Sequence, residues 1–141
     1  MEERTPLLLD ASEESDLRAL CTFRYQIRKF LHFSESAARQ EGLEPQQHQL
    51  LLSIHGLDGP PTIRQLADHL LIQHHSAVGL IDRLEERGLV ERSRAENDRR
   101  QVNVRLTVAG ERILQRLSKV HREELRQSAP ELVGALQSAL R

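Results

Sequence analysis

Two adjacent arginines, Arg99 and Arg100, follow Asp98 between two segments that are predicted to be strands. The segment 101–107 (QVNVRLT) has the two-residue period of a half-buried strand, and 89–94 (LVERSR) is predicted to be its partner strand. Residues 95–100 are then the connection of a β-hairpin. Arginine is attracted to the negative potential of a narrow minor groove in DNA. A solvated turn with a surface ion pair worth ~0–1 kcal/mol is the alternative. The hairpin carries more arginines than acidic residues, which favours nucleic-acid contact, and these arginines are Arg92, Arg94, Arg99, Arg100 and Arg105.

Two short helices are predicted to position this hairpin. TIRQLADHL begins with Thr62, and Gln65 three residues later completes a capping-box pattern. HSAVGLIDRLEERG has an apolar face at helical spacing and ends at Gly88. Its predicted inward residues are Ala77, Leu80, Ile81 and Leu84. The order helix, turn, helix and hairpin over residues 62–107 indicates a winged helix-turn-helix, whose second helix can enter the major groove of DNA.

The outward face of the second helix supplies candidate DNA contacts. Gln73 and His74 lie at its N-terminal end, where free backbone N–H groups attract phosphate. Gly79 lacks a side chain, so the helix backbone can approach DNA closely there. An ordinary solvated helix surface is the alternative at each position taken singly. The candidate DNA-binding residues are Thr62, Arg64, Gln73, His74, His75, Ser76, Gly79, Arg83, Arg94, Asp98, Arg99 and Arg100.

Helices are also predicted on both sides of this region. Residues 1–11 are predicted to be a flexible tail, and 12–42 a long helix that Ser12 or Ser15 caps. The apolar stripe of that helix is broader than a monomer of this size needs, so a second chain is expected to cover part of it. A further helix runs over 45–56. After the hairpin, Thr107 is predicted to cap a helix over 108–128, and Pro130 to begin a separate last helix.

The composition limits the class of protein. The chain has 141 residues, 38% of them hydrophobic and 29% charged, with three Phe, one Tyr and no Trp, so a leucine-rich helical domain is expected. The net charge is −1, but the first sixteen residues hold six acidic side chains against one arginine, which leaves the remainder basic. Cys21 is the only cysteine, which favours a cytoplasmic location. We expect no membrane span, no signal peptide, no metal, no cofactor and no catalytic centre.

The stretch LADHLLIQHHSAVGLIDRLEERGLVERSRAENDRRQVNVRLTVAGERIL resembles the MarR family of bacterial transcription regulators, most specifically in LIDRLEERGLVER, the DRR wing and LTVAGE. The resemblance extends over roughly residues 16–128. It implies a mostly α single domain over 1–141, with a DNA-binding region over 45–107 and dimerisation helices over 12–42 and 108–141. The implied dimer-interface residues are Leu17, Leu20, Leu125, Leu132, Leu136 and Leu140.

The resemblance also implies a function, namely that of a homodimeric repressor bound to a pseudo-palindromic operator in double-stranded DNA and released by a small, often aromatic, effector. Asp98 and Arg100 match the D-x-R wing motif of the family, which makes Arg100 the expected minor-groove residue. The segment QHHSAVG departs from the usual run of hydroxyl residues followed by a basic residue, so an unusual target site is expected.

Two alternatives remain open from the sequence. Cys21, with Tyr25 four residues later, is similar to the oxidant-sensing branch of the family, although the region from Phe30 to Leu57 contains none of that branch's other tyrosines. A lone cysteine is more often a small buried hydrophobe. The second alternative is a winged-helix module that binds protein rather than DNA, which the weak net charge and the histidines of the second helix favour.

Overall fold

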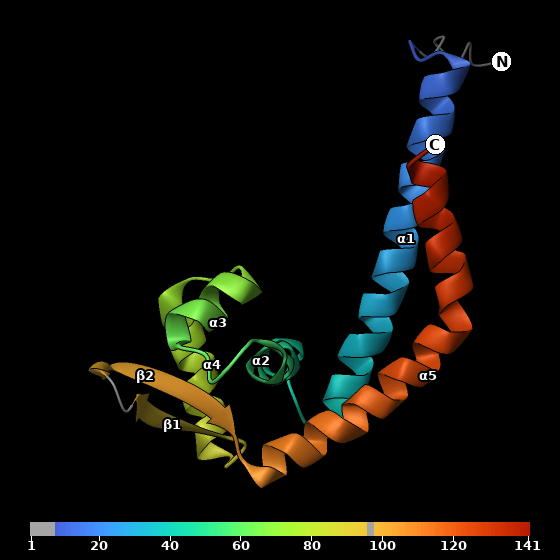
Figure 1. The fold of residues 1–141 in the computed structure, drawn as a ribbon. Helices are drawn as coiled ribbons and strands as arrows, with labels where there is room; N and C mark the ends of the chain where they lie inside the picture. The colour runs from blue at the N-terminus through green and yellow to red at the C-terminus, as the bar shows by residue number, and fades with distance from the viewer. Residues whose placement is uncertain (1–7, 96–97) are drawn as a thin grey trace, which may run out of the picture. The chain divides into compact units, whose positions relative to one another are not determined.

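The computed structural model describes residues 8–95 and 98–141, and the side chains of Ala95, Asp98 and Arg99 lie outside what it describes. The fold is mostly helical with one two-stranded hairpin, as predicted. The elements are α1 (Ala11–Gln40), α2 (Pro45–Gly56), α3 (Ile63–Leu70), α4 (His74–Glu86), β1 (Val90–Ala95), β2 (Asp98–Leu106) and α5 (Val108–Ala139) (Figure 1). Among the described residues, no helix is both long enough and apolar enough to cross a membrane.

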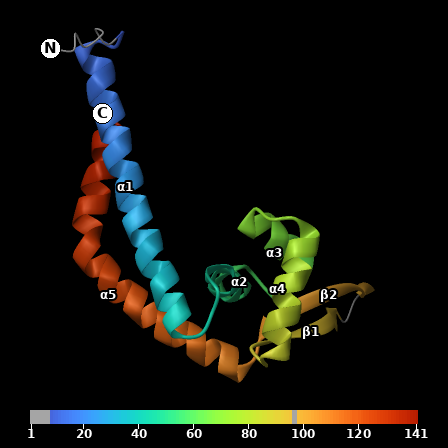
Figure 2. The same cartoon turned by 180° about the vertical axis from the view of Figure 1, so that it is seen from behind.

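The chain divides into two compact units. The first contains the chain up to Phe33 and from Arg122 onwards, and the second contains Ser34–His121. In the first unit, the N-terminal part of α1 and the C-terminal part of α5 lie side by side (Figures 1 and 2). Lys29 of α1 pairs with Glu131 of α5 there, at 3.8 Å between Nζ and Oε2.

The start of α1 differs from the prediction. The helix begins at Ala11, and its cap is formed by Asp10 rather than by Ser12 or Ser15. The Glu13 backbone N–H donates to Oδ1 of Asp10 at 2.8 Å, and the Asp10 backbone N–H donates to Oε2 of Glu13 at 3.0 Å. This reciprocal pair of hydrogen bonds satisfies two amides at once, which a single serine hydroxyl further along cannot do.

Pro130 does not begin a separate helix, contrary to the prediction, because α5 is continuous from Val108 to Ala139 with Pro130 inside it. A proline in a helix interior removes one backbone hydrogen bond. Ala135, beyond the proline, is buried within the first unit. Tertiary packing contributes most of the stability of a helix in a protein, and here it outweighs the lost hydrogen bond.

The second unit has an aliphatic core. Leu50 and Leu51 of α2, Leu66 of α3, Ile81 of α4 and Val104 of β2 have no exposed surface. The helix predicted over residues 45–56 is confirmed as α2. Gly42 follows α1 with a φ of +75°, and α2 begins at Pro45.

The capping box that begins α3 is confirmed. The Gln65 backbone N–H donates to Oγ1 of Thr62 at 3.1 Å, and the Thr62 backbone N–H donates to Oε1 of Gln65 at 2.9 Å. Leu71 ends the helix in the left-handed conformation with a φ of 57°. The turn from α3 to α4 is therefore short, as a helix-turn-helix requires.

The hairpin is antiparallel and regular from Val90 opposite Leu106 to Arg94 opposite Val102, and its register then shifts so that Ala95 lies opposite Asp98. β2 therefore begins at Asp98, and the backbones of Arg99 and Arg100 belong to the strand. The prediction that residues 95–100 form the connection is wrong at both ends, because Ala95 belongs to β1 and residues 98–100 belong to β2. The strands continue beyond the register shift, although the apolar alternation in the sequence starts only at Val102. On its other edge β2 is held by the segment before α3, since the Val104 N–H donates to the Pro61 carbonyl oxygen at 2.9 Å.

The hairpin of β1 and β2 is called the wing below. Thr107 joins the end of the wing to the start of α5, and its predicted role as a cap is confirmed. Its hydroxyl donates to the Gly88 carbonyl oxygen at 2.6 Å and accepts from the Gly110 N–H at 3.1 Å. A Cβ atom on Gly110 would lie 2.1 Å from the Leu89 carbonyl oxygen. The close approach of α5 to Leu89, in the turn between α4 and β1, therefore requires glycine at position 110.

Candidate nucleic-acid interface

The predicted inward face of α4 is confirmed. Its four predicted members, Ala77, Leu80, Ile81 and Leu84, are all buried. His74, His75 and Ser76 in the first turn are exposed, and Gly79 is half-buried. Burial of the apolar side thus fixes which polar side chains α4 presents to the outside.

The N-terminal end of α4 is suited to an anion. Gln73 precedes the helix in an extended conformation, and its side chain makes no capping hydrogen bond. Its carbonyl oxygen accepts from the N–H groups of Ser76 and Ala77, each at 3.1 Å. The first amides of a helix have no partner within the helix and carry the positive end of its dipole. Phosphate is a natural acceptor for such a group of amides.

Arg64, near the start of α3, lies close to this end of α4. Together with Ala67, Asp68, Ile72 and His74 it lines an open hollow of about 410 Å³. The structure therefore brings a cation from α3 and a histidine from the first turn of α4 to one concave surface. Thr62, two residues earlier, is half-buried and engaged in the cap of α3.

The wing is joined to α4 by Arg92. Its guanidinium donates to Oε1 of Glu85 at 2.8 Å and to Oδ1 of Asp82 at 2.5 Å, and its backbone N–H donates to Oε2 of Glu85 at 3.1 Å. In the sequence Arg92 is one of five arginines counted in the hairpin, although it is not among the candidate DNA-binding residues. In the structure its guanidinium is engaged in holding the hairpin against the helix.

The remaining arginines of the hairpin fall into two groups. Arg105 pairs with Glu91 across the two strands, at 2.9 Å between Nε and Oε1. Arg94 and Arg100 are exposed. The side chains of Asp98 and Arg99, both predicted to contact DNA, lie outside the described residues. The described part of the wing therefore presents the cations of Arg94 and Arg100 at its surface.

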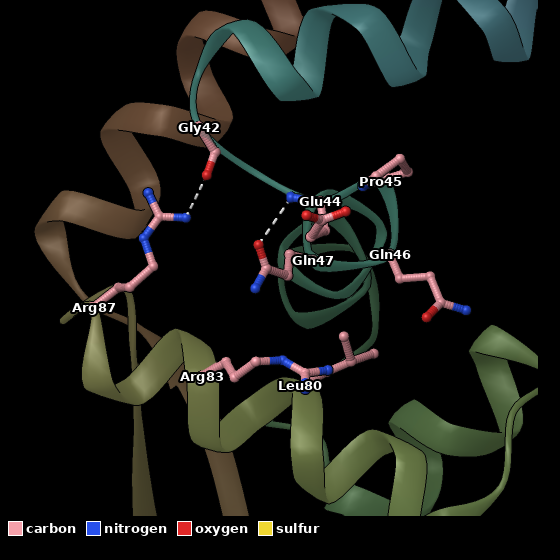
Figure 3. A pocket seen from close by; sticks show the side chains of 8 residues that line it. All are labelled: Gly42, Glu44, Pro45, Gln46, Gln47, Leu80, Arg83 and Arg87. Atoms are coloured by element: carbon pink, nitrogen blue, oxygen red, sulfur yellow. Dashed lines mark hydrogen bonds between the residues drawn. The ribbon is translucent and has the colours of Figure 1, made fainter.

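Arg83 lies on a different concave surface from the first turn of α4. It lines an open hollow of about 700 Å³ between α4 and the first turn of α2, together with Gly42, residues 44–47, Leu80 and Arg87. Figure 3 shows the side chain of Arg83 in the space between the two helices. Nη1 of Arg87 donates to the Gly42 carbonyl oxygen at 2.7 Å and closes one side of the hollow. The structure thus separates Arg83 from the group around His74.

A buried polar cluster was not predicted. His48 of α2 is 4% exposed, and its ring centroid lies 5.0 Å from that of His121 in α5. His121 Nε2 is 2.7 Å from the Ser34 hydroxyl, and its Nδ1 is 2.7 Å from the Leu117 carbonyl oxygen. Burial and the neighbouring His121 lower the pKa of His48 to about 4. Among the described residues, no group of three or more side chains has the composition and spacing to hold a metal ion.

Many apolar side chains of the first unit are exposed in the single chain. Leu17, Leu20, Leu136 and Leu140 are exposed, while Leu125 and Leu132 are half-buried. Cys21 is also exposed, so it is not the small buried hydrophobe that its isolation in the sequence favoured.

Comparison with known proteins agrees with this arrangement. The family model described as MarR family matches residues 41–101, which include the helix-turn-helix and the first strand of the wing. An uncharacterised HTH-type transcriptional regulator, YkoM of Bacillus subtilis (strain 168), is 28% identical over 116 residues, covering 80% of this chain and 75% of that protein.

Solved structures share the fold. AbsC, a MarR family transcriptional regulator from Streptomyces coelicolor, superposes with a TM-score of 0.73 at 23% identity over 96% of this chain and 94% of AbsC. A MarR family protein from Bacillus stearothermophilus gives 0.71 at 24% identity over 84% and 81% of the two chains. A mutant of Staphylococcus aureus MepR bound to an oligodeoxyribonucleotide gives 0.64 at 20% identity over 84% and 95%.

The winged helix-turn-helix with long flanking helices, together with these matches, defines a DNA-binding transcriptional regulator. The fold is that of the MarR family, whose model matches residues 41–101.

Proposed function

We propose that the protein is a homodimeric repressor that binds a pseudo-palindromic operator and is released from it by a small-molecule effector. The observation that carries this proposal is the exposed first turn of α4, with its uncapped N-terminal amides, in the same unit as a wing that exposes Arg94 and Arg100. A helix and an adjacent cationic hairpin are the two parts with which a winged helix-turn-helix contacts DNA.

In this proposal each part of the winged helix-turn-helix has its own role. The first turn of α4, from Gln73 to Ser76, enters the major groove, and Thr62 and Arg64 at the start of α3 contact the phosphates beside it. Arg100 enters the minor groove, and Arg94 contacts the backbone. Asp98, Arg99 and Arg83 belong to the proposed set on the basis of the sequence alone.

We assign dimerisation to residues 12–42 and 108–141 and DNA binding to residues 45–107, within a single domain over 1–141. The exposed leucines of the first unit support the assignment, because a second copy would remove them from water. In a dimer, the two winged helix-turn-helix regions would be related by a two-fold axis and would contact half-sites about 34–36 Å apart.

The effector site is proposed in the hollow beside Arg83. Its lining includes a guanidinium together with Leu80 and Pro45, which suits a small aromatic acid. Leu80 and Arg83 both belong to α4, so a ligand there would contact the helix that reads DNA. Such a ligand would release the operator if it bound the DNA-free form more tightly than the DNA-bound form.

Selection from a pool of random DNA duplexes tests the proposal, because it does not require the operator sequence to be known. The full chain is expected to enrich one pseudo-palindrome with half-site centres one helical turn apart, and its mass in solution should be that of two chains. Arg64→Ala should bind the selected duplex more weakly, whereas Gln49→Ala, on the exposed face of α2, should bind it normally. Failure to enrich any sequence would contradict the proposal and favour a protein-binding module.

A further inference from the structure

Gly79 occupies the middle of α4 without any reason in the packing of the described residues. A Cβ atom built on Gly79 meets no heavy atom within 4 Å. Its φ is not positive, so the backbone does not require glycine either. Glycine in the middle of a helix is less stable than alanine. The contrast with Gly110 is direct, because a Cβ atom there would collide with the Leu89 carbonyl oxygen.

The position of Gly79 places it at a low point on the exposed face of α4. The neighbours one turn before it on the helix surface are His75 and Ser76, and those one turn after it are Asp82 and Arg83. All four are exposed, and Asp82 is held by Arg92. A group that approaches α4 from outside can therefore come closer to the backbone at Gly79 than at any of these four neighbours.

The chemistry of such a group follows from what Gly79 can offer. Its N–H and C=O lie in the helix interior, where helix hydrogen bonds use them. Gly79 therefore presents only Cα–H and cannot read a donor or acceptor on a base. The C5-methyl group of thymine is the apolar group that base pairs expose in the major groove.

We propose that the missing side chain of Gly79 makes room for a thymine methyl group in each half-site of the operator, so that Gly79 determines specificity for thymine at that position. The inference rests on the proposed binding of α4 in the major groove. Alanine at position 79 would fill the same space with its own methyl group, and the two methyl groups would then compete for it.

The test adds a methyl group to the protein by Gly79→Ala and removes one from the DNA by replacing thymine with uracil. Uracil lacks the C5-methyl group of thymine and pairs identically, so each thymine of the selected operator is replaced in turn by uracil in both half-sites. Gly79→Ala should bind the all-thymine operator about tenfold more weakly than the natural chain, as a single poor base contact does. At one position, uracil should restore the affinity of Gly79→Ala while weakening that of the natural chain.

A matched control removes the effect of helix propensity. Gly56 ends α2, and a Cβ atom there also meets no heavy atom within 4 Å. Both Gly56→Ala and Gly79→Ala should melt at or above the temperature of the natural chain, so reduced DNA binding by Gly79→Ala cannot come from unfolding. Gly56→Ala should bind every duplex as the natural chain does.

Equal affinity of Gly79→Ala and the natural chain for the operator would overturn the inference while leaving operator binding intact. A loss that no uracil position restores would overturn it as well. If the natural chain binds no specific duplex, the proposed function itself fails together with the inference.

Discussion

Arg92 of β1 and Glu85 of α4 are joined twice, once from the guanidinium to Oε1 at 2.8 Å and once from the backbone N–H to Oε2 at 3.1 Å. Partial burial opposes the charged form of Arg92, but Asp82 and Glu85 together raise its pKa, so the guanidinium stays protonated. The placement of the wing against α4 therefore depends on one arginine whose guanidinium faces the protein.

Arg92→Ala is expected to lower the free energy of unfolding by about 1–2 kcal/mol, because it removes two ion pairs and leaves Glu85 without its partner. The Arg92 side chain is 26% exposed, whereas that of Arg105 is 61% exposed and has one partner. Arg105→Ala should therefore cost only ~0–1 kcal/mol. Urea denaturation of both variants measures the difference, and equal losses would show that Arg92 is an ordinary surface arginine.

Gly110→Ala is expected to destabilise the protein by about 1–3 kcal/mol or more, because the added methyl group must displace the backbone at Leu89. The same measurement on Gly56→Ala provides the control, since no atom lies near that site. Thermal unfolding should separate the two variants clearly. A Gly110→Ala protein as stable as the natural chain would mean that α5 and Leu89 are not packed this closely.

The stability of the protein should depend on pH through His48. Its pKa in the folded state is lowered to about 4, so the unfolded chain binds a proton more readily between that value and the ordinary pKa of about 6.5. The contribution of His48 to stability is therefore complete above about pH 6.5. It decreases as the pH falls towards 4, by roughly 3 kcal/mol at most.

His48→Leu tests this dependence, because leucine fills a similar volume and does not titrate. The free energy of unfolding of His48→Leu, followed from pH 7.5 to pH 4.5, should fall less steeply than that of the natural chain. His55→Gln, an exposed position on the same helix, should leave the profile unchanged. Identical profiles for the natural chain and His48→Leu would assign the acid sensitivity to other groups.

Local signals in the sequence predicted the helix starts of the winged helix-turn-helix well. Pro45 begins a helix because its fixed φ suits the first helical position. Thr62 with Gln65, and Thr107, each begin a helix through hydrogen bonds to residues three positions away. All of these roles are visible in the sequence itself. The apolar spacing of α4 fixed its buried face in the same way. Which side chains are left to face outwards follows directly from that spacing.

The errors arose where tertiary contacts decide the outcome. Pro130 has the usual signature of a helix start, but the packing of α5 beyond it keeps one helix continuous. The ion pair of Arg92 was not predicted, because nothing local indicates that Asp82, ten residues earlier, pairs with it. The cluster of His48, His121 and Ser34 joins three helices across long separations, and no sequence spacing marks it.

The affinity of the full chain for its selected operator, measured against salt concentration for the natural protein and for Arg100→Ala, tests the central claim most directly. Phosphate contacts release counterions, so the affinity of the natural chain should fall steeply as salt rises. Arg100→Ala should bind at least about tenfold more weakly, while Arg105→Ala, whose guanidinium pairs with Glu91, should bind nearly as the natural chain does. An affinity that does not change with salt and is equal in all three proteins would contradict DNA reading by α4 and the wing.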